Sequence, residues 1–163
     1  PLIANPYAET GVKVVTIADL RWKRRDIKST SMLAQAMGKQ AAKLKGAYEA
    51  WMVEDGHINE GTSSSAFILD QDGVIRTQPL GHHILPGVTR RAVLRLAALE
   101  GVSLQERPFS VAEALAAREA FMTAASAFVL PVVEIDGVKI GGGRPGPMAR
   151  KFRALYIEEA RKS

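Results

Sequence analysis

Three Asp-Gly pairs, each between short runs of β-branched and other apolar residues, constrain the fold of this chain more than any other feature. They are Asp55-Gly56, Asp72-Gly73 and Asp136-Gly137. An Asp-Gly pair suits the central positions of a two-residue hairpin turn, because both positions need a positive φ angle. The sequence therefore predicts a strand, a turn and a second strand around each pair.

Other apolar runs and helical spacings complete the outline. The strands expected are residues 12–17, 47–53 with a partner after residue 56, two short ones within 65–79, 102–107, 121–125, 131–135 and 138–140. Four helices are expected: residues 32–44, residues 89–100, a short helix opened by a Ser110 and Glu113 capping box, and a last helix near the end of the chain. The first has Ser29 to Ser31 as N-cap candidates and Gly46 as its stop. The last has the apolar face Met148, Phe152, Leu155 and Tyr156. Helices that alternate with hairpin-linked strands predict a mixed α and β fold.

Composition limits the class of protein. The chain has 163 residues, of which 47% are hydrophobic, enough to bury a core within one domain. It has no cysteine, which excludes disulfides, thiolate metal ligands and a cysteine nucleophile. No apolar stretch reaches the length of a membrane span, and the first residues show no signal-peptide pattern. We therefore expect a cytoplasmic protein without a membrane partner, whose first residue is an interior position of a longer chain.

The net charge is +5, and the densest basic cluster is "RWKRRDIK", residues 21–28. Such a cluster would suit a phosphate-bearing partner, so a basic nucleic-acid-binding domain is the non-enzyme alternative. Elsewhere lysines and arginines are scattered among glutamates, without the interleaved aromatic residues of single-strand binders. We therefore expect no nucleic-acid partner.

Two kinds of catalytic site find little support in the residues. His57, His82 and His83 have no metal-ligand spacing with acidic residues, so no metal site is expected. The stretch "GTSSSA" lacks the flanking glycines of a nucleophile elbow, which argues against a serine hydrolase.

Two local features remain as candidates. In "LPGVTRRAV" the backbone N–H groups of Gly87, Val88 and Thr89 lie at a predicted helix N-terminus, where an anion would be stabilised, although this stretch alone favours Thr89 as a plain N-cap. Lys28 lies between a predicted strand and a helix, near Arg24 and Arg25. There it would act as a Schiff-base nucleophile if it were desolvated, and otherwise it is an ordinary surface lysine.

Five motifs in order along the chain resemble those of the class IV aminotransferases, the fold-type IV pyridoxal-phosphate enzymes. They are "DIKSTSML", "INEGTSSSAFIL", "ILPGVTR", "ERPFSVAEALAAREAFMT" and "PVVEIDGVKIGGGRPGP". The resemblance runs from about residue 14 to residue 156. It implies the D-amino-acid aminotransferase-like fold, in which the C-terminal large domain has a hairpin-rich pseudo-barrel sheet flanked by helices, and it implies pyridoxal 5'-phosphate (PLP) as the cofactor.

The resemblance also assigns roles. Lys28 in "DIKS" matches the lysine that forms a Schiff base with PLP and moves the proton of the substrate's α-carbon. Glu60 in "NEGTSSS" matches the glutamate at the pyridine nitrogen, where a carboxylate keeps the ring protonated so that it can take up electrons. Ser63 and Ser64 match the hydroxyl run on the cofactor and substrate side, although serines in such a run also stabilise turns.

The phosphate end of the cofactor has its own matches. Val88 and Thr89 in "LPGVTR" match the pair that holds the phosphate, and Leu85 matches a residue that packs against the ring. At the position where many relatives carry a phosphate-binding threonine, this chain has Ala125. We expect backbone N–H groups to hold the phosphate there in place of the missing hydroxyl.

The resemblance implies an incomplete enzyme. Residues 1–13 are expected to be the remnant of an inter-domain linker and residues 14–163 the PLP-binding C-terminal domain, whereas the smaller N-terminal domain of the family is absent from this chain. Within the family "RWKRRDIKS" and "LAQAMGKQAAK" look most like D-amino-acid aminotransferases, and a homodimer is expected.

The implied activity is a ping-pong transamination between an amino acid, with D-amino acids such as D-alanine favoured, and a 2-oxo acid. The alternatives within the family are a branched-chain L-amino-acid aminotransferase and an aminodeoxychorismate lyase, which would use the same lysine and cofactor.

Overall fold

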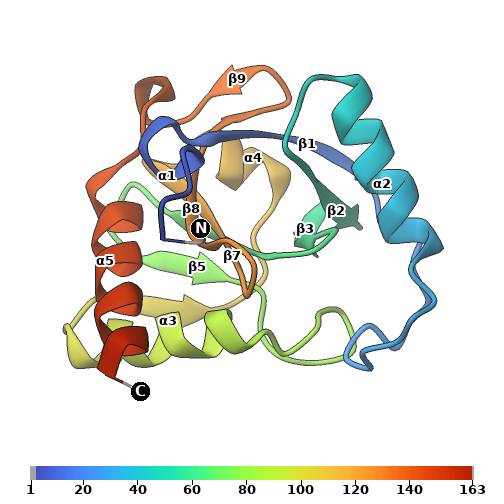
Figure 1. Ribbon diagram of the computed structural model, residues 1–163. Coiled ribbons are helices and arrows are strands. Elements are labelled where there is room, and N and C mark those ends of the chain that lie inside the picture. The colour runs from blue at the N-terminus through green and yellow to red at the C-terminus, as the bar shows by residue number, and fades with distance from the viewer. Residues whose placement is uncertain (1–2, 163) are drawn as a thin grey trace.

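One mixed sheet of nine strands organises the chain, and the computed structural model describes residues 3–162 (Figure 1). The strands are β1 (Val12–Ala18), β2 (Glu49–Glu54), β3 (His57–Gly61), β4 (Ser65–Leu69), β5 (Ile75–Thr77), β6 (Leu104–Glu106), β7 (Glu119–Ala124), β8 (Phe128–Ile135) and β9 (Val138–Lys139). The helices are α1 (Tyr7–Thr10), α2 (Leu33–Leu44), α3 (Val88–Leu99), α4 (Val111–Leu115), the 3₁₀ turn η1 (Gly141–Gly143) and α5 (Pro147–Lys162). The mixed fold predicted from the sequence is confirmed.

The sheet is curled, and its connections require the curl. Its strand order is β3-β2-β1-β8-β7-β4-β5-β6, with β9 paired to β8. In a flat sheet β3 and β4 would lie five strand spacings apart, or about 24 Å. The connection from Gly61 to Ser65 has four Cα–Cα steps and spans at most about 15 Å. The sheet must therefore bend until β3 approaches β4, which produces the predicted pseudo-barrel.

Successive residues of the strands face two different cores, because side chains alternate across a sheet. On β4, Ala66 and Ile68 pack with Trp51 and Met122 in the core inside the curl. Phe67 and Leu69 point to the opposite face, into the core beneath α3 and α5. The ring of Phe67 stacks on that of Phe121 with centroids 4.9 Å apart. Both faces of the central strands are therefore buried, as their continuous apolar runs suggest.

The helices cover separate parts of the sheet. In Figure 1, α5 lies at the left and α3 along the bottom, and the two contact each other, whereas α2 lies at the right and packs on β1 and β2. The core under α2 is small and centres on Val15, Ala42 and Ala50. Glu119 on β7 accepts hydrogen bonds at 3.1 Å from the first free N–H groups of α5, those of Met148 and Ala149, and so caps that helix. No helix in residues 3–162 is long and apolar enough to cross a membrane.

The predicted hairpin turns are present, with one difference. Asp55 and Asp136 have φ angles of 49°, and the glycines after them also have positive φ, as a tight two-residue turn requires. At the third pair only Gly73 has a positive φ angle. There the Asp70 carboxylate accepts the backbone N–H groups of Asp72 and Val74, so a longer loop with its own hydrogen bonds joins β4 to β5.

The capping predictions had mixed outcomes. The capping box of Ser110 and Glu113 is confirmed, with hydrogen bonds of 3.1 and 2.7 Å. The N-cap predicted within residues 29–31 is wrong. The N-cap of α2 is Met32, and its side chain makes no capping hydrogen bond. Ser29 instead accepts the N–H of Ser31, because a serine in an irregular stretch readily bonds the backbone two residues on.

Two further details concern the predicted boundaries. Thr89 is not an N-cap, because α3 begins one residue earlier with Gly87 at its N-cap, which leaves Thr89 inside the helix and buried. Within the predicted linker remnant, residues 7–10 form a helical turn with Ala8 buried, and β1 starts at Val12. The division into a linker and a cofactor-binding domain stays a prediction.

Candidate functional site

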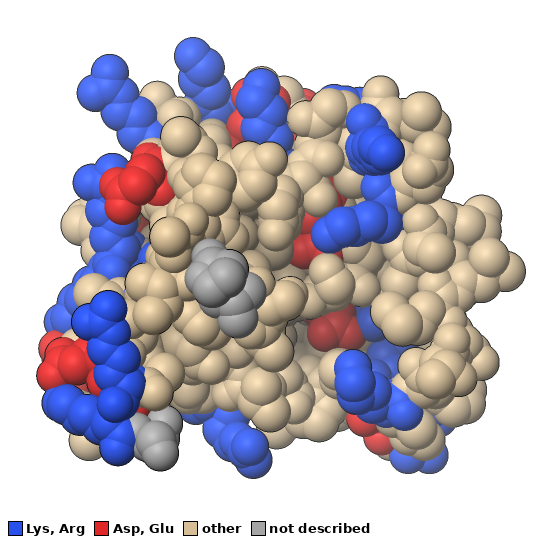
Figure 2. All heavy atoms as spheres, in the orientation of Figure 1, with Lys and Arg blue, Asp and Glu red and all other residues tan. Residues whose placement is uncertain are grey.

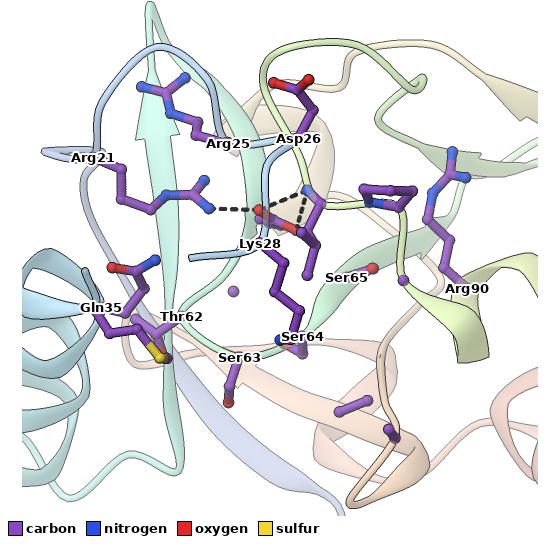
Figure 3. A pocket seen from close by; sticks show the side chains of 18 of the residues that line it. Arg21, Arg25, Asp26, Lys28, Gln35, Thr62, Ser63, Ser64, Ser65 and Arg90 are labelled. Carbon is purple, nitrogen blue, oxygen red and sulfur yellow. Dashed lines mark hydrogen bonds and ion pairs between the residues drawn. The ribbon is translucent and has the colours of Figure 1, made fainter. Parts of the chain in front are cut away.

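A cavity of about 460 Å³ opens where four segments meet: the loop before α2, the turn between β3 and β4, the N-terminus of α3 and the end of β7. Figure 3 shows the side chains that line it. Every residue singled out from the sequence as a site residue lines this cavity, namely Lys28, Glu60, Ser63, Ser64, Leu85, Val88, Thr89 and Ala125. The fold therefore gathers residues that are far apart in the sequence into one site, and their chemical roles stay predictions.

Lys28 lies in the irregular loop between β1 and α2, four residues before the N-cap of that helix. Its side chain points from the loop into the cavity, toward Ser63 and Ser64 (Figure 3). Within the described residues its amine makes no hydrogen bond or ion pair. Lys28 is thus an accessible amine at a lined cavity rather than one member of a surface ion pair.

Two buried arginines hold the loop that carries Lys28. Arg25 is 4% exposed, and its side chain donates to Glu54 at 2.7 Å while its backbone N–H donates to His82 at 3.0 Å. Arg21 donates two hydrogen bonds, of 2.9 and 2.8 Å, to Asp19 at the end of β1. Burial alone would raise the pKa of Asp19, but hydrogen bonds from Arg21 and Asn59 hold it below its ordinary value. The ion pairs of Arg21 with Asp19 and of Arg25 with Glu54 therefore hold the loop that carries Lys28 against the ends of β1 and β2.

Glu60, on β3, is the buried carboxylate of the cavity. It accepts a hydrogen bond from Arg21 at 2.5 Å and others from the N–H of Leu85 at 3.1 and 3.3 Å. Burial raises the pKa of Glu60 to about 7, and the guanidinium of Arg21 opposes that rise. A positively charged group bound in the cavity would stabilise the ionised form further, so Glu60 is suited to hold a protonated ring nitrogen.

The N-terminus of α3 forms another wall. Its N-cap is Gly87, and no side chain caps the helix, so its first N–H groups are available to a ligand. Val88 and Thr89 follow, and the Thr89 hydroxyl lies 3.5 Å from that of Tyr156. A Cβ on Gly87 would lie 3.1 Å from the Ser65 hydroxyl, tighter than ordinary contact, which explains why glycine suits this position. The helix end can stabilise an anion such as a phosphate.

Thr123 is a site residue that the sequence analysis missed. It lies on β7, lines the cavity and is 2% exposed, yet its hydroxyl has no hydrogen-bond partner within the described residues. A buried hydroxyl without a partner is unfavourable unless a ligand satisfies it. Ala125 lies two residues further on, in the turn after β7, and lines the same cavity. The available signal was nearness in the sequence, because Thr123 lies within the quoted motif "ERPFSVAEALAAREAFMT".

The hydroxyls of Ser63 and Ser64 line the cavity but donate to a residue behind it. Ser63 donates at 2.8 Å and Ser64 at 2.5 Å to the carboxylate of Glu49. Glu49 lies on β2 and is fully buried. Glu49 belongs to none of the sequence motifs. A single glutamate in a predicted strand can be identified as unusual only when its burial is known.

The basic cluster of residues 21–28 has a structural explanation. Arg21 and Arg25 are buried in ion pairs, Arg24 pairs with Asp26 at 2.9 Å, and Lys23 pairs with Glu54. On the face shown in Figure 2, lysines and arginines are interspersed with acidic residues rather than gathered into one patch. Arg21 and Arg25 therefore offer no exposed charge to a nucleic acid, and the absence of a nucleic-acid partner stays a prediction. No group of three or more His, Asp or Glu residues in the described part of the chain could hold a metal ion.

Comparison with known sequences identifies the family of the chain. Residues 2–135 match the family model of the class IV amino-transferases. The D-alanine aminotransferase of Bacillus licheniformis is 42% identical over 145 residues, which cover 89% of this chain and 51% of that protein. The D-alanine aminotransferase of Staphylococcus haemolyticus is 35% identical, with 94% of this chain and 56% of that protein covered. The chain thus spans about half the length of the curated relatives it matches.

Solved structures of similar fold belong to the same family. The branched-chain aminotransferase of the archaeon Thermoproteus uzoniensis, solved with norvaline, superposes with a TM-score of 0.83 at 30% identity, over 94% of this chain and 53% of that one. The branched-chain amino acid aminotransferase of Thermobaculum terrenum, solved in its PLP form, gives a TM-score of 0.84 at 25% identity, over 94% of this chain and 52% of that one. With the family model matched over most of its length, the chain belongs to the class IV aminotransferase family.

Proposed function

We propose that this chain is the cofactor-binding part of a PLP-dependent transaminase that moves an amino group between an amino acid and a 2-oxo acid. The observation that carries the proposal is the convergence of three groups on one cavity: the amine of Lys28, the carboxylate of Glu60 and the uncapped N-terminus of α3. They match the three parts of PLP that a protein must hold, namely the aldehyde, the ring nitrogen and the phosphate.

The residues present fit that cofactor. The N–H groups at the start of α3, the Thr89 hydroxyl and the Thr123 hydroxyl, which has no partner among residues 3–162, provide donors for a phosphate, even though Ala125 has no hydroxyl. Glu60 provides the carboxylate for the ring nitrogen, and its own position is fixed by Arg21 and by the Leu85 N–H. The unpaired donor is the most informative of these, because a ligand phosphate would satisfy it.

Each residue then has a defined task. PLP, when bound, supplies an electrophilic aldehyde and a ring that takes up electrons from the substrate. The amine of Lys28 would hold the cofactor at its aldehyde end, and the same amine would move the proton at the substrate's α-carbon. Glu60 keeps a proton on the ring nitrogen, while Arg21 and Leu85 stop its carboxylate from turning away.

D-amino acids such as D-alanine are the proposed amino donors, because the sequence relatives with the higher identities are D-alanine aminotransferases. The second candidate is a branched-chain L-amino-acid aminotransferase, which the similarity to solved branched-chain enzymes favours. We further propose residues 14–163 as the cofactor-binding domain after a linker remnant at 1–13, a homodimer, and the cytoplasm as the location.

A labelling experiment tests the proposal. The chain is mixed with PLP, the absorption of the complex is recorded, and the complex is reduced with borohydride before peptide mass spectrometry. We expect the modified peptide to carry PLP on Lys28. Lys28→Ala should abolish labelling, whereas Lys43→Ala, a change of an exposed lysine in the last turn of α2, should not. Labelling spread equally over surface lysines, or full labelling of Lys28→Ala, would contradict the proposal. Assays with D-alanine and L-leucine separate the two candidates.

A further inference from the structure

Glu49 is a fully buried carboxylate outside the set of residues that the proposed function uses. Its exposed fraction is 0%, and it lies on β2 directly behind the turn between β3 and β4. It accepts hydrogen bonds from the Thr62 hydroxyl at 2.7 Å, the Ser63 N–H at 2.7 Å, the Ser63 hydroxyl at 2.8 Å and the Ser64 hydroxyl at 2.5 Å. The amine of Lys39 lies 3.7 Å away. The hydroxyls of this turn therefore converge on one carboxylate.

These contacts fix where the hydroxyl protons point. A serine hydroxyl has one proton and two acceptor lone pairs. Because Ser63 and Ser64 give their protons to Glu49, only lone pairs remain for other partners, and one of those on Ser63 already accepts from Lys39 at 3.5 Å. Both serines line the cavity. The wall that they form can therefore accept hydrogen bonds from a ligand and cannot donate them.

The close packing of the turn makes an alternative arrangement difficult. A Cβ on Gly61 would clash with the Ser64 hydroxyl and would lie 3.0 Å from the Glu49 carboxylate. The backbone of Gly61 also donates to the Ser64 carbonyl at 2.8 Å. The turn therefore lies against Glu49 with no room for a side chain at position 61, so the hydroxyls stay directed toward the carboxylate.

We propose that Glu49 is a positioning residue that turns the hydroxyl protons of Ser63 and Ser64 away from the cavity, so that this wall selects a positively charged amino group. Lys28 points toward the same two serines (Figure 3), so the acceptor wall faces the place where amines are handled. A carboxylate would receive no hydrogen bond from either hydroxyl, because both protons are given to Glu49. We therefore expect the substrate's carboxylate to find its hydrogen-bond donors at another wall. The inference rests on the proposed function and adds to it how the substrate is oriented.

The test compares two ligands with the same ring and phosphate. Pyridoxamine 5'-phosphate carries an ammonium group on the 4' carbon, and pyridoxine 5'-phosphate carries a hydroxyl there. Their dissociation constants are measured by calorimetry on the full chain. The unchanged protein should prefer the ammonium ligand. Glu49→Gln should reduce that preference about tenfold, because the new amide donates to one serine and turns its proton into the cavity. Glu134→Gln, which alters an ion pair with Lys13 and lies outside the lining of the cavity, should leave the preference unchanged.

The outcomes separate the two proposals. A general loss of structure would weaken both ligands together and would not change their ratio, so a changed ratio reports on this wall. The double change Ser63→Ala and Ser64→Ala keeps the carboxylate of Glu49, so its ratio reports on the serine hydroxyls alone. If Glu49→Gln does not fold, the double change Ser63→Ala and Ser64→Ala must lower the ratio instead, because it removes the acceptors. Equal ratios in all of these proteins would overturn the inference and leave the proposed function intact. If neither ligand binds the unchanged chain, the proposed function fails and the inference fails with it.

Discussion

The buried carboxyl of Glu60 gives a pH dependence of stability that can be worked out from the structure. Its side chain is 6% exposed, and burial raises its pKa to about 7 from an ordinary value of 4.5. In the unfolded chain the group ionises first as the pH rises, so the unfolded state is stabilised relative to the folded state between pH 4.5 and 7. The free energy of unfolding should therefore fall as the pH rises through this window, the opposite of the usual behaviour of a surface carboxylate.

The size of this effect follows from the shift. One pKa unit corresponds to about 1.4 kcal/mol, so the whole window is worth about 3 kcal/mol, and about 2 kcal/mol of it lies between pH 5 and 8. Glu60→Gln removes the titrating group, so the variant should lose less stability than the unchanged protein over this range, by about 2 kcal/mol. Urea unfolding of the cofactor-free chain at the two pH values, followed by circular dichroism, measures the difference.

A matched control separates this effect from other titrations. Glu158 is fully exposed on α5, and its hydrogen bond from Lys162 lowers its pKa. Any stability it contributes is lost only as the pH falls below the range used, so Glu158→Gln should keep the pH slope of the unchanged protein. Identical slopes for Glu60→Gln and the unchanged protein would refute the reasoning, because they would mean that Glu60 is solvated in the folded chain.

Two further predictions concern individual contacts. Thr123→Val should leave the cofactor-free chain as stable or slightly more stable, since it removes a buried hydroxyl without a partner in the described residues, yet it should weaken PLP binding about tenfold, as calorimetry would show. A variant that binds PLP as tightly as the unchanged protein would contradict this role. Glu119→Gln should lower the free energy of unfolding by about 1 kcal/mol, because the carboxylate charge at the N-terminus of α5 is lost, and urea unfolding at pH 7 would measure it. Unchanged stability would show that the charge adds nothing to the cap.

The local parts of the fold could be predicted because their signals are local. The turns at Asp55 and Asp136, the capping box at Ser110 and the apolar face of α5 each depend on residues a few positions apart. The order of the strands could not be read in the same way. Thr16 donates its N–H to Asp136 at 2.7 Å across a separation of 120 residues, and nothing near either residue indicates the other. Pairing of β1 with β8 became visible only in the structure.

The residues of the site also divide into those with a local sequence signal and those without one. Lys28, Glu60 and Thr89 could be predicted from motif order, because each lies in a recognisable stretch. In the sequence Arg21 and Arg25 belong to the densest basic cluster, which would suit a phosphate-bearing partner, although their side chains are buried and ion-paired. Charge counted along a sequence does not reveal which cations face inward, since that depends on where distant carboxylates such as Glu60 come to lie.

The curl of the sheet links the fold to the site. The turn of residues 62–64 lies where β3 approaches β4, so the residues that close the curl are the same ones that form a wall of the cavity. Helix α2 packs closely against the turn of residues 62–64. A Cβ on Gly38 would lie 2.7 Å from the Thr62 side chain and 2.6 Å from that of Ile17, so a side chain at this position would force these neighbours to move. Because a buried Glu49 holds the turn from behind and α2 holds it from the side, the wall is rigid before any ligand arrives. Burying polar residues at this point lowers the stability of the fold relative to an apolar core. Their burial is explained if the cavity beside this turn is the catalytic site.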